Sequence, residues 1–255
     1  MDAMFDAGRT ASAQTLAMEL DRAPLPYVDG ALANPVLDVG LVLLILQKNR
    51  GITASQIARI GRNRAWLKPY EVKAAIVLHP RTPRPLAMGL VQFLWWRDLA
   101  RAADQASLAP PLRRAAETLL GIRLKELALG EQVALARIAT RGVIGILRRA
   151  HDPMVIRALL QNPRLVEEDA LVIASGKGTP PAVLQALAED ARLAKRPSLQ
   201  KALVQNPVTP PAAALHLLQG LATQALRELT LAPQVPTLVK VAALRIVEAR
   251  THPAE

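Results

Sequence analysis

The sequence predicts an all-α fold, an α-solenoid of short antiparallel helices that is internally duplicated. Three observations predict it. Alanine and leucine dominate a chain of 255 residues that is 51% hydrophobic but only 3% aromatic, and such a composition favours helices over strands. Prolines recur, among a total of 20, where helices are expected to begin or end. A long segment of the first half of the chain also returns, with substitutions, in the second half.

The internal repeat is clearest when residues 74–94 are aligned with residues 201–221. Identical residues stand at eight places in this alignment: Val77, Pro80, Thr82, Pro83, Ala87, Leu90, Gln92 and Leu94 match Val204, Pro207, Thr209, Pro210, Ala214, Leu217, Gln219 and Leu221. Asn34-Pro35 returns in the same way as Asn162-Pro163. A repeat of this kind is the sequence signature of a repetitive architecture.

The repeat divides the chain into four parts. The first solenoid copy covers residues 26–120 and the second covers 153–250. Residues 121–152 are expected to form connecting helices. Residues 1–25 match neither copy, and they alternate between acidic and apolar positions. Because the end repeats of a solenoid need covering, these residues are interpreted as an N-terminal capping helix or as an arm.

Threonine and proline mark the expected helix starts. A threonine side chain can accept from the first backbone N–H groups, and proline at the first helical position loses no hydrogen bond. N-cap threonines, three of them followed by proline, are therefore predicted at Thr53, Thr82-Pro83, Thr179-Pro180 and Thr209-Pro210. The residue before proline avoids the helical region, so helices are expected to end at Asn34, His79, Asn162 and Asn206. Helices this short must stack on neighbours to persist.

These short helices and their proline-marked starts resemble the HEAT-like α-solenoid class, and most of all its bacterial branch near the leucine-rich repeat variant proteins. The resemblance covers most of residues 26–250. It implies a curved array of antiparallel helices with a protein-binding or scaffolding role. The leucine-rich repeat variant family carries a cluster held by cysteines. That feature does not transfer, because this chain has no cysteine.

Charge and aromatic residues are distributed unevenly along the chain. Of the net charge of +11, residues 34–128 carry +9 and residues 162–255 carry +2, whereas residues 1–33 carry −3. All seven aromatic residues precede residue 97: Phe5, Tyr27, Trp66, Tyr70, Phe93, Trp95 and Trp96. Where the first copy has Trp95-Trp96, the second has Ala222-Thr223. The shared scaffold therefore does not require the basic and aromatic residues of the first copy.

The candidate partner-binding residues fall into two clusters of the first copy. Arginine and tryptophan are the residue types that most often anchor interfaces. The first cluster is Arg59, Arg62, Arg64, Trp66, Lys68 and Tyr70, and the second is Trp95, Trp96, Arg97 and Arg101. Two interpretations stay open for each kind of residue. The tryptophans either pack between helices or form exposed anchors, and the arginines either form a solvated face or contact a ligand.

The expected function is that of a non-catalytic helical-repeat scaffold, which binds an acidic partner protein or segment through the basic and aromatic face of the first copy. Nucleic-acid binding is the alternative, because a net charge of +11 and clustered arginines suit phosphates. A less favoured alternative is an enzyme. Trp95, Trp96, Arg97 and Asp98 loosely resemble the Trp, Asp and Arg residues that alkylpurine DNA glycosylases use on such a fold.

No catalytic, metal or cofactor site is expected. The four histidines are far apart, and Glu167, Glu168 and Asp169 stand at a helix start, where carboxylates complement the helix dipole. The longest apolar runs, at 39–46 and 86–96, are shorter than the roughly 20 residues of a membrane span. The N-terminal residues lack the apolar core of a secretory signal. A cytoplasmic protein without a membrane span is the expectation.

Overall fold

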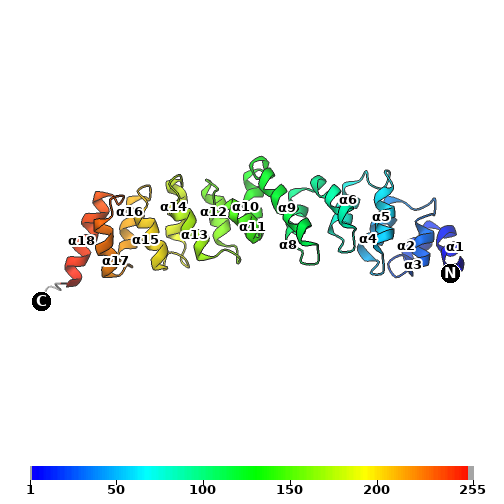
Figure 1. The fold of residues 1–255 in the computed structure, drawn as a ribbon, viewed down its shortest axis with the longest axis horizontal. Coiled ribbons are helices and arrows are strands. Elements are labelled where there is room, and N and C mark those ends of the chain that lie inside the picture. Colours follow the sequence, from blue (N-terminus) through cyan, green and yellow to red (C-terminus); the bar gives the residue numbers. More distant parts are fainter. Residues whose placement is uncertain (1, 252–255) are drawn as a thin grey trace. The chain divides into compact units, whose positions relative to one another are not determined.

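The computed structural model describes residues 2–251, and every regular element in that range is helical. It contains eighteen α-helices and two 3-10 helices, and no strand occurs among the described residues. The prediction of an all-α fold is therefore confirmed. The chain forms two compact units, the first ending at Arg123 and the second beginning at Leu124 (Figure 1).

Each unit contains nine α-helices. The first unit has α1 (Asp2–Thr10), α2 (Ala13–Glu19), α3 (Leu25–Ala31), α4 (Val39–Lys48), α5 (Ala54–Arg62), α6 (Tyr70–Leu78), α7 (Arg84–Leu90), the 3-10 helix η1 (Val91–Phe93), α8 (Trp96–Asp104) and α9 (Pro110–Arg123). The second has the 3-10 helix η2 (Leu124–Glu126), α10 (Leu129–Ile138), α11 (Arg141–Leu147), α12 (Pro153–Leu160), α13 (Glu167–Ala174), α14 (Pro181–Glu189), α15 (Pro197–Gln205), α16 (Pro211–Leu218), α17 (Thr223–Leu231) and α18 (Thr237–Thr251).

The helices of the two units follow the same spacing along the chain. Helices with the same place in the order, from α1 and α10 to α9 and α18, begin 127 or 128 residues apart. This spacing includes the first two helices of each unit, α1 and α2 in one and α10 and α11 in the other. These are the segments for which the aligned residues gave no match.

Alternate helices stack on one another within each unit. In the first unit α4 packs on α2, α6 on α4 and α8 on α6, while α3 packs on α1 and α9 on α7. In the second unit α12, α14, α16 and α18 pack in succession, and α15 packs on α13. Aliphatic side chains such as Leu16, Ile45 and Ile76 are fully buried between them. Because the α-helices have only 7 to 15 residues, their stability depends on this stacking.

Buried asparagines join successive helix pairs by hydrogen bonds that the sequence did not reveal. The Asn49 side chain donates through Nδ2 to the carbonyl oxygens of Leu20 (2.7 Å) and Ala23 (3.1 Å), and its Oδ1 accepts from the N–H of Gly51 (2.8 Å). Asn34, Asn162 and Asn206 make the same three kinds of bond. The helix ends predicted near the Asn-Pro and His-Pro steps are confirmed.

The prediction of N-cap threonines is right at one position and wrong at three. Thr53 caps α5, accepting from the N–H of Gln56 at 3.3 Å. The other three stand one residue before the N-cap, which is Pro83, Pro180 or Pro210. Their hydroxyls donate instead to a carbonyl oxygen six residues earlier, at the end of the preceding helix: Thr82 to Ile76 (2.5 Å), Thr179 to Ile173 (2.8 Å) and Thr209 to Leu203 (2.6 Å). These threonines therefore fix loops rather than begin helices.

Helix α1 crosses α3 at two glycines. A Cβ atom on Gly8 would lie 2.2 Å from the Tyr27 carbonyl oxygen, and one on Gly30 would lie 2.0 Å from the Phe5 carbonyl oxygen. The absence of side chains at both positions thus lets the two backbones touch. Within residues 1–25, interpreted from the sequence as an N-terminal capping helix or an arm, the structure has the two helices α1 and α2, and α1 packs closely on α3.

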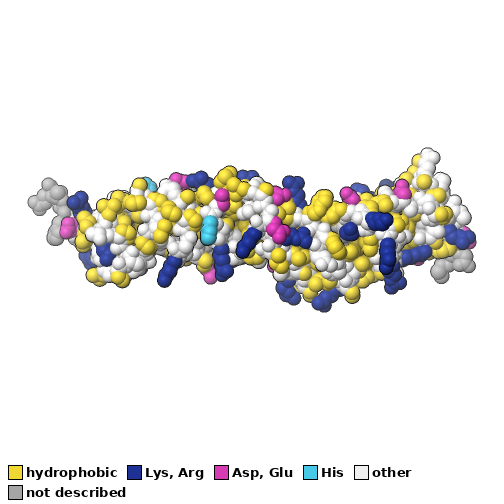
Figure 2. All heavy atoms as spheres, turned by 90° about the horizontal axis from the view of Figure 1, so that it is seen from above, with side chains coloured by type: hydrophobic (Ala, Val, Ile, Leu, Met, Phe, Trp, Pro, Cys, Tyr) yellow, Lys and Arg dark blue, Asp and Glu magenta, His cyan; other side chains and the backbone are white. Residues whose placement is uncertain are grey.

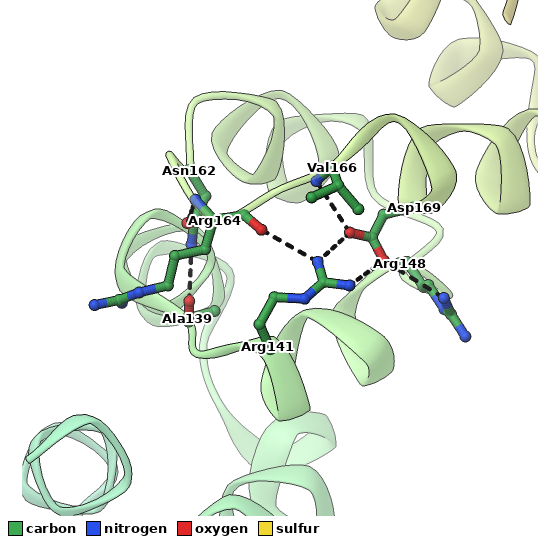
Figure 3. A network of polar contacts seen from close by, with 7 residues as sticks. All are labelled: Ala139, Arg141, Arg148, Asn162, Arg164, Val166 and Asp169. Carbon is green, nitrogen blue, oxygen red and sulfur yellow. Dashed lines mark hydrogen bonds and ion pairs between the residues drawn. The ribbon is translucent and has the colours of Figure 1, made fainter. Parts of the chain in front are cut away.

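A buried carboxylate accepts hydrogen bonds from several residues in the first half of the second unit (Figure 3). The Asp169 side chain is 1% exposed and accepts hydrogen bonds from Arg141, from Arg148 (3.4 Å) and from the N–H of Val166 (3.2 Å). Burial opposes ionisation, but the hydrogen bonds and charges of the arginines outweigh it, so the pKa of Asp169 is lowered. Asp169 therefore lies in the first turn of α13, at a helix start as predicted, and it also binds the N–H of the N-cap Val166 and joins α13 to α11.

Candidate functional site in the first unit

Net charge does not distinguish the two units. With the boundary at Arg123, the first unit carries +6 and the second +5. The excess assigned to the first copy from the sequence arose because the segments compared, 34–128 and 162–255, left out residues 1–33, which carry −3, and residues 129–161, which carry +3. What does distinguish the units is the aromatic content, because all seven aromatic residues lie in the first.

The two predicted clusters meet at one aromatic pair. The rings of Tyr70 and Trp95 stack with their centroids 3.9 Å apart and their planes at 11°. Tyr70 is the first residue of α6, and Trp95 is the N-cap of α8. The Tyr70 hydroxyl accepts from the backbone N–H of Trp95 at 3.0 Å and donates to the carboxylate of Asp98. The first cluster thus contacts the second through Tyr70.

Tyr70, on which Trp95 stacks, lines a groove along α6. The groove has a volume of about 650 Å³, and it is lined by the end of α4, by α6 and by the first half of α8. Lys48, Arg50 and Arg101 bring three cations to its walls, while Ala74 and Ala75 form part of its floor. Lys48 comes from the end of α4, Arg50 from the loop after it, and Arg101 from α8.

Two carboxylates and a histidine also line the groove. Glu71 and Asp98 lie beside Tyr70, and His79 lies at the end of α6. Burial and the hydrogen bond to Asp98 raise the pKa of Tyr70 to about 12, so its hydroxyl stays a donor at neutral pH. Burial, with the charge of Arg81, lowers the pKa of His79. Its Nδ1 accepts from the N–H of Arg81 at 3.1 Å.

The tryptophans have different environments. Trp95 is 64% exposed, so the interpretation that it packs in the core is wrong for this residue. Trp66 and Trp96 are half-buried, and the guanidinium of Arg97 lies over the Trp96 ring at 5.3 Å. Phe93, two residues before Trp95, is also exposed and has the Lys73 ammonium over its ring at 5.6 Å.

Most of the predicted basic residues lie outside the groove. Arg59 on α5 donates to the carbonyl oxygen of Asp29 at 3.3 Å, so it contacts α3. Arg62 ends α5, and Arg64 and Lys68 lie in the exposed segment before α6. Of the ten predicted site residues, Tyr70 and Arg101 line the groove. Lys48 and Arg50 were missed because they end a helix that no aromatic residue marks in the sequence.

The second unit carries different residues at the corresponding places. At the 127-residue spacing, Tyr70, Trp95 and Asp98 correspond to Pro197, Ala222 and Ala225. Ala74 and Arg101 correspond to Lys201 and Glu228, whose side chains form an ion pair at 2.5 Å between α15 and α17. The second unit therefore has an ion pair at the two places where the first has Ala74 and Arg101, which cannot form one with each other.

Other sites were sought along residues 2–251. No group of three or more His, Asp and Glu side chains in that range lies close enough to hold a metal ion. None of the described helices is long and apolar enough to cross a membrane. Asp98, the carboxylate of the glycosylase-like alternative, is bound to the Tyr70 hydroxyl. Comparison of the chain with protein-family models, curated proteins and solved structures gives no match.

Proposed function

We propose that this chain is a non-catalytic helical-repeat scaffold, whose first unit binds an acidic segment of a partner protein in the groove over α6. One observation carries the proposal. Lys48, Arg50 and Arg101 converge on the groove from the end of α4, the loop after it and α8, and Tyr70, on which the exposed Trp95 stacks, also lines the groove. Cations next to a fixed aromatic ring are features that anchor a protein interface.

The scaffold itself is proposed to be an internally duplicated α-solenoid of the HEAT-like class, near the leucine-rich repeat variant proteins and working in the cytoplasm. The spacing of the helices supports duplication. So do equivalent bonds in both units: Arg123 donates to the carbonyl oxygens of Gln92 and Leu94, and Arg250 donates to those of Gln219 and Leu221. The stacking of alternate helices supports a solenoid, because each helix contacts its neighbours in the series.

Two observations favour an acidic protein segment over a nucleic acid. The groove contains Glu71 and Asp98, which would repel a continuous run of phosphates. Figure 2 shows one face of the molecule, on which Lys and Arg side chains are separated by hydrophobic and uncharged areas instead of forming a continuous stripe. Binding of a nucleic acid is therefore the less favoured alternative, and the titration below distinguishes it from binding of an acidic segment.

Binding of fluorescent probes tests the proposal. The probes are a peptide of Glu and Asp residues and a single-stranded oligonucleotide, each titrated with the full chain at two salt concentrations. We expect the peptide to bind at low salt and a Lys48→Ala/Arg50→Ala/Arg101→Ala variant to lose most of that binding. An Arg227→Ala variant, which removes an exposed cation of the second unit, should bind as the wild type does. Binding of the oligonucleotide alone would refute the proposal.

A further inference from the structure

Trp95 is exposed and yet held in place. Its ring stacks on Tyr70, its backbone N–H donates to the Tyr70 hydroxyl, and that hydroxyl is held in turn by Asp98. An exposed ring that is already fixed loses little conformational freedom when a partner covers it, which is the property of an interface anchor.

The scaffold does not need this anchor. The second unit forms α15 and α17 with Pro197, Ala222 and Ala225 at the places of Tyr70, Trp95 and Asp98. All three members of the arrangement are thus missing together, although the helices that carry them are present. This joint absence indicates that the arrangement serves a ligand and not the fold.

The charges near the anchor restrict what can lie on it. Asp98 and Glu71 line the part of the groove beside Tyr70, so a carboxylate placed next to Trp95 would be repelled. The cations of the groove are distributed between Lys48 at the end of α4, Arg50 in the loop after it, and Arg101 on α8. A uniformly acidic chain would suit the three cations, but it would be repelled by Glu71 and Asp98.

We infer that the partner segment is acidic and carries an apolar side chain, which packs on Trp95 while neighbouring carboxylates pair with Arg101 and with Lys48 or Arg50. This inference rests on the proposed function and deepens it. Ala74 and Arg101 correspond to Lys201 and Glu228 of the second unit. Lys201 forms an ion pair with Glu228, whereas Ala74 has no charged group. Residue 74 thus cannot pair with Arg101, which lines the groove that would receive the carboxylate of the partner.

The experiment compares two labelled peptides of Glu and Asp, one with a central Leu and one with Ser in its place. The wild-type chain should bind the Leu peptide about tenfold more tightly, because burial of an anchor contact is worth more than 1 kcal/mol. Trp95→Ala should abolish that preference and leave the Ser peptide nearly unaffected. Ala74→Lys/Arg101→Glu installs the ion pair of the second unit, so it should fold, and it should weaken both peptides equally.

The outcomes separate the inference from the proposed function. Equal binding of both peptides by the wild type, or a Leu preference that survives Trp95→Ala, overturns the inference and leaves the proposed function standing. Failure of both peptides to bind overturns the proposed function as well. Unchanged binding of both peptides by Ala74→Lys/Arg101→Glu refutes the role given to Arg101, and circular dichroism of each variant checks that its helices are intact.

Discussion

Removal of one asparagine side chain should destabilise the first unit far more than its size suggests. Asn49 is buried, and its amide makes three hydrogen bonds, two of which reach the loop after α2. Asn49→Ala removes all three and leaves the carbonyl oxygens of Leu20 and Ala23 without this donor. At about 1 kcal/mol for each bond, the expected loss is about 3 kcal/mol in the free energy of unfolding.

Asn63 provides the matched control. Its Oδ1 accepts from the N–H groups of Ala65 (3.0 Å) and Trp66 (3.3 Å), so both bonds stay within one turn and join no second helix pair. Asn63→Ala should therefore cost about 1 kcal/mol or less. Both positions lie in the first unit, as do all three tryptophans. Urea unfolding followed by tryptophan fluorescence consequently reports the unit that each substitution affects.

The comparison of the two variants decides the matter. If Asn49→Ala lies within about 1 kcal/mol of the wild type, or loses no more than Asn63→Ala, the bonds between helix pairs do not stabilise the unit as argued. Asn49→Asp keeps the acceptor for Gly51 but turns a charge toward two carbonyl oxygens. It should therefore be at least as destabilising as Asn49→Ala in the same assay.

Three further expectations concern packing and charge. Gly30→Ala would bring a Cβ atom to 2.0 Å from the Phe5 carbonyl oxygen, so it should destabilise the first unit by about 1–3 kcal/mol in urea unfolding; an unchanged midpoint contradicts the close crossing. Because the pKa of His79 is lowered from 6.5, the unfolded chain takes up its proton first, and the stability present above pH 6.5 should fall as pH drops toward the folded-state pKa. His79→Asn, which copies Asn206, should flatten that dependence between pH 7 and about 5.5, and an equally steep fall counts against His79. Asp169→Ala leaves Arg141 and Arg148 without their carboxylate and should cost the second unit about 3 kcal/mol by circular dichroism; a loss below about 1 kcal/mol refutes this role.

The sequence predicted features whose causes are local. Helical composition, and proline near helix ends, depend on residues a few positions apart, so the all-α fold and the helix end at His79 were predictable. The three threonines were misplaced by one residue because the Thr-Pro pattern does not say whether the hydroxyl acts forward, as a cap, or backward, as it does in Thr209.

The groove was predictable only in part, because it joins segments far apart in the chain. The contrast of Trp95 with Ala222 marked a residue that the second unit does without, and the structure places Trp95 on the surface. No comparable signal linked Lys48 or Arg50 to Tyr70, since their common place on the groove depends on how α4 packs on α6. The net charge of each segment was misleading for a different reason: its value depended on where the boundaries of the segments were drawn.

The asparagine bonds also bear on the order in which the chain can be built. Through Nδ2, each of the four asparagines binds carbonyl groups between 23 and 32 residues earlier, and its third bond, through Oδ1, accepts from an N–H only two residues later. During synthesis from the N-terminus, the carbonyl groups that each asparagine binds through Nδ2 have therefore been synthesised before the asparagine itself. Hydrogen bonds between residues this close in the sequence also carry a low entropic cost of loop closure, and such local contacts favour fast folding. A growing chain can thus add one helix pair after another while its remainder is still on the ribosome.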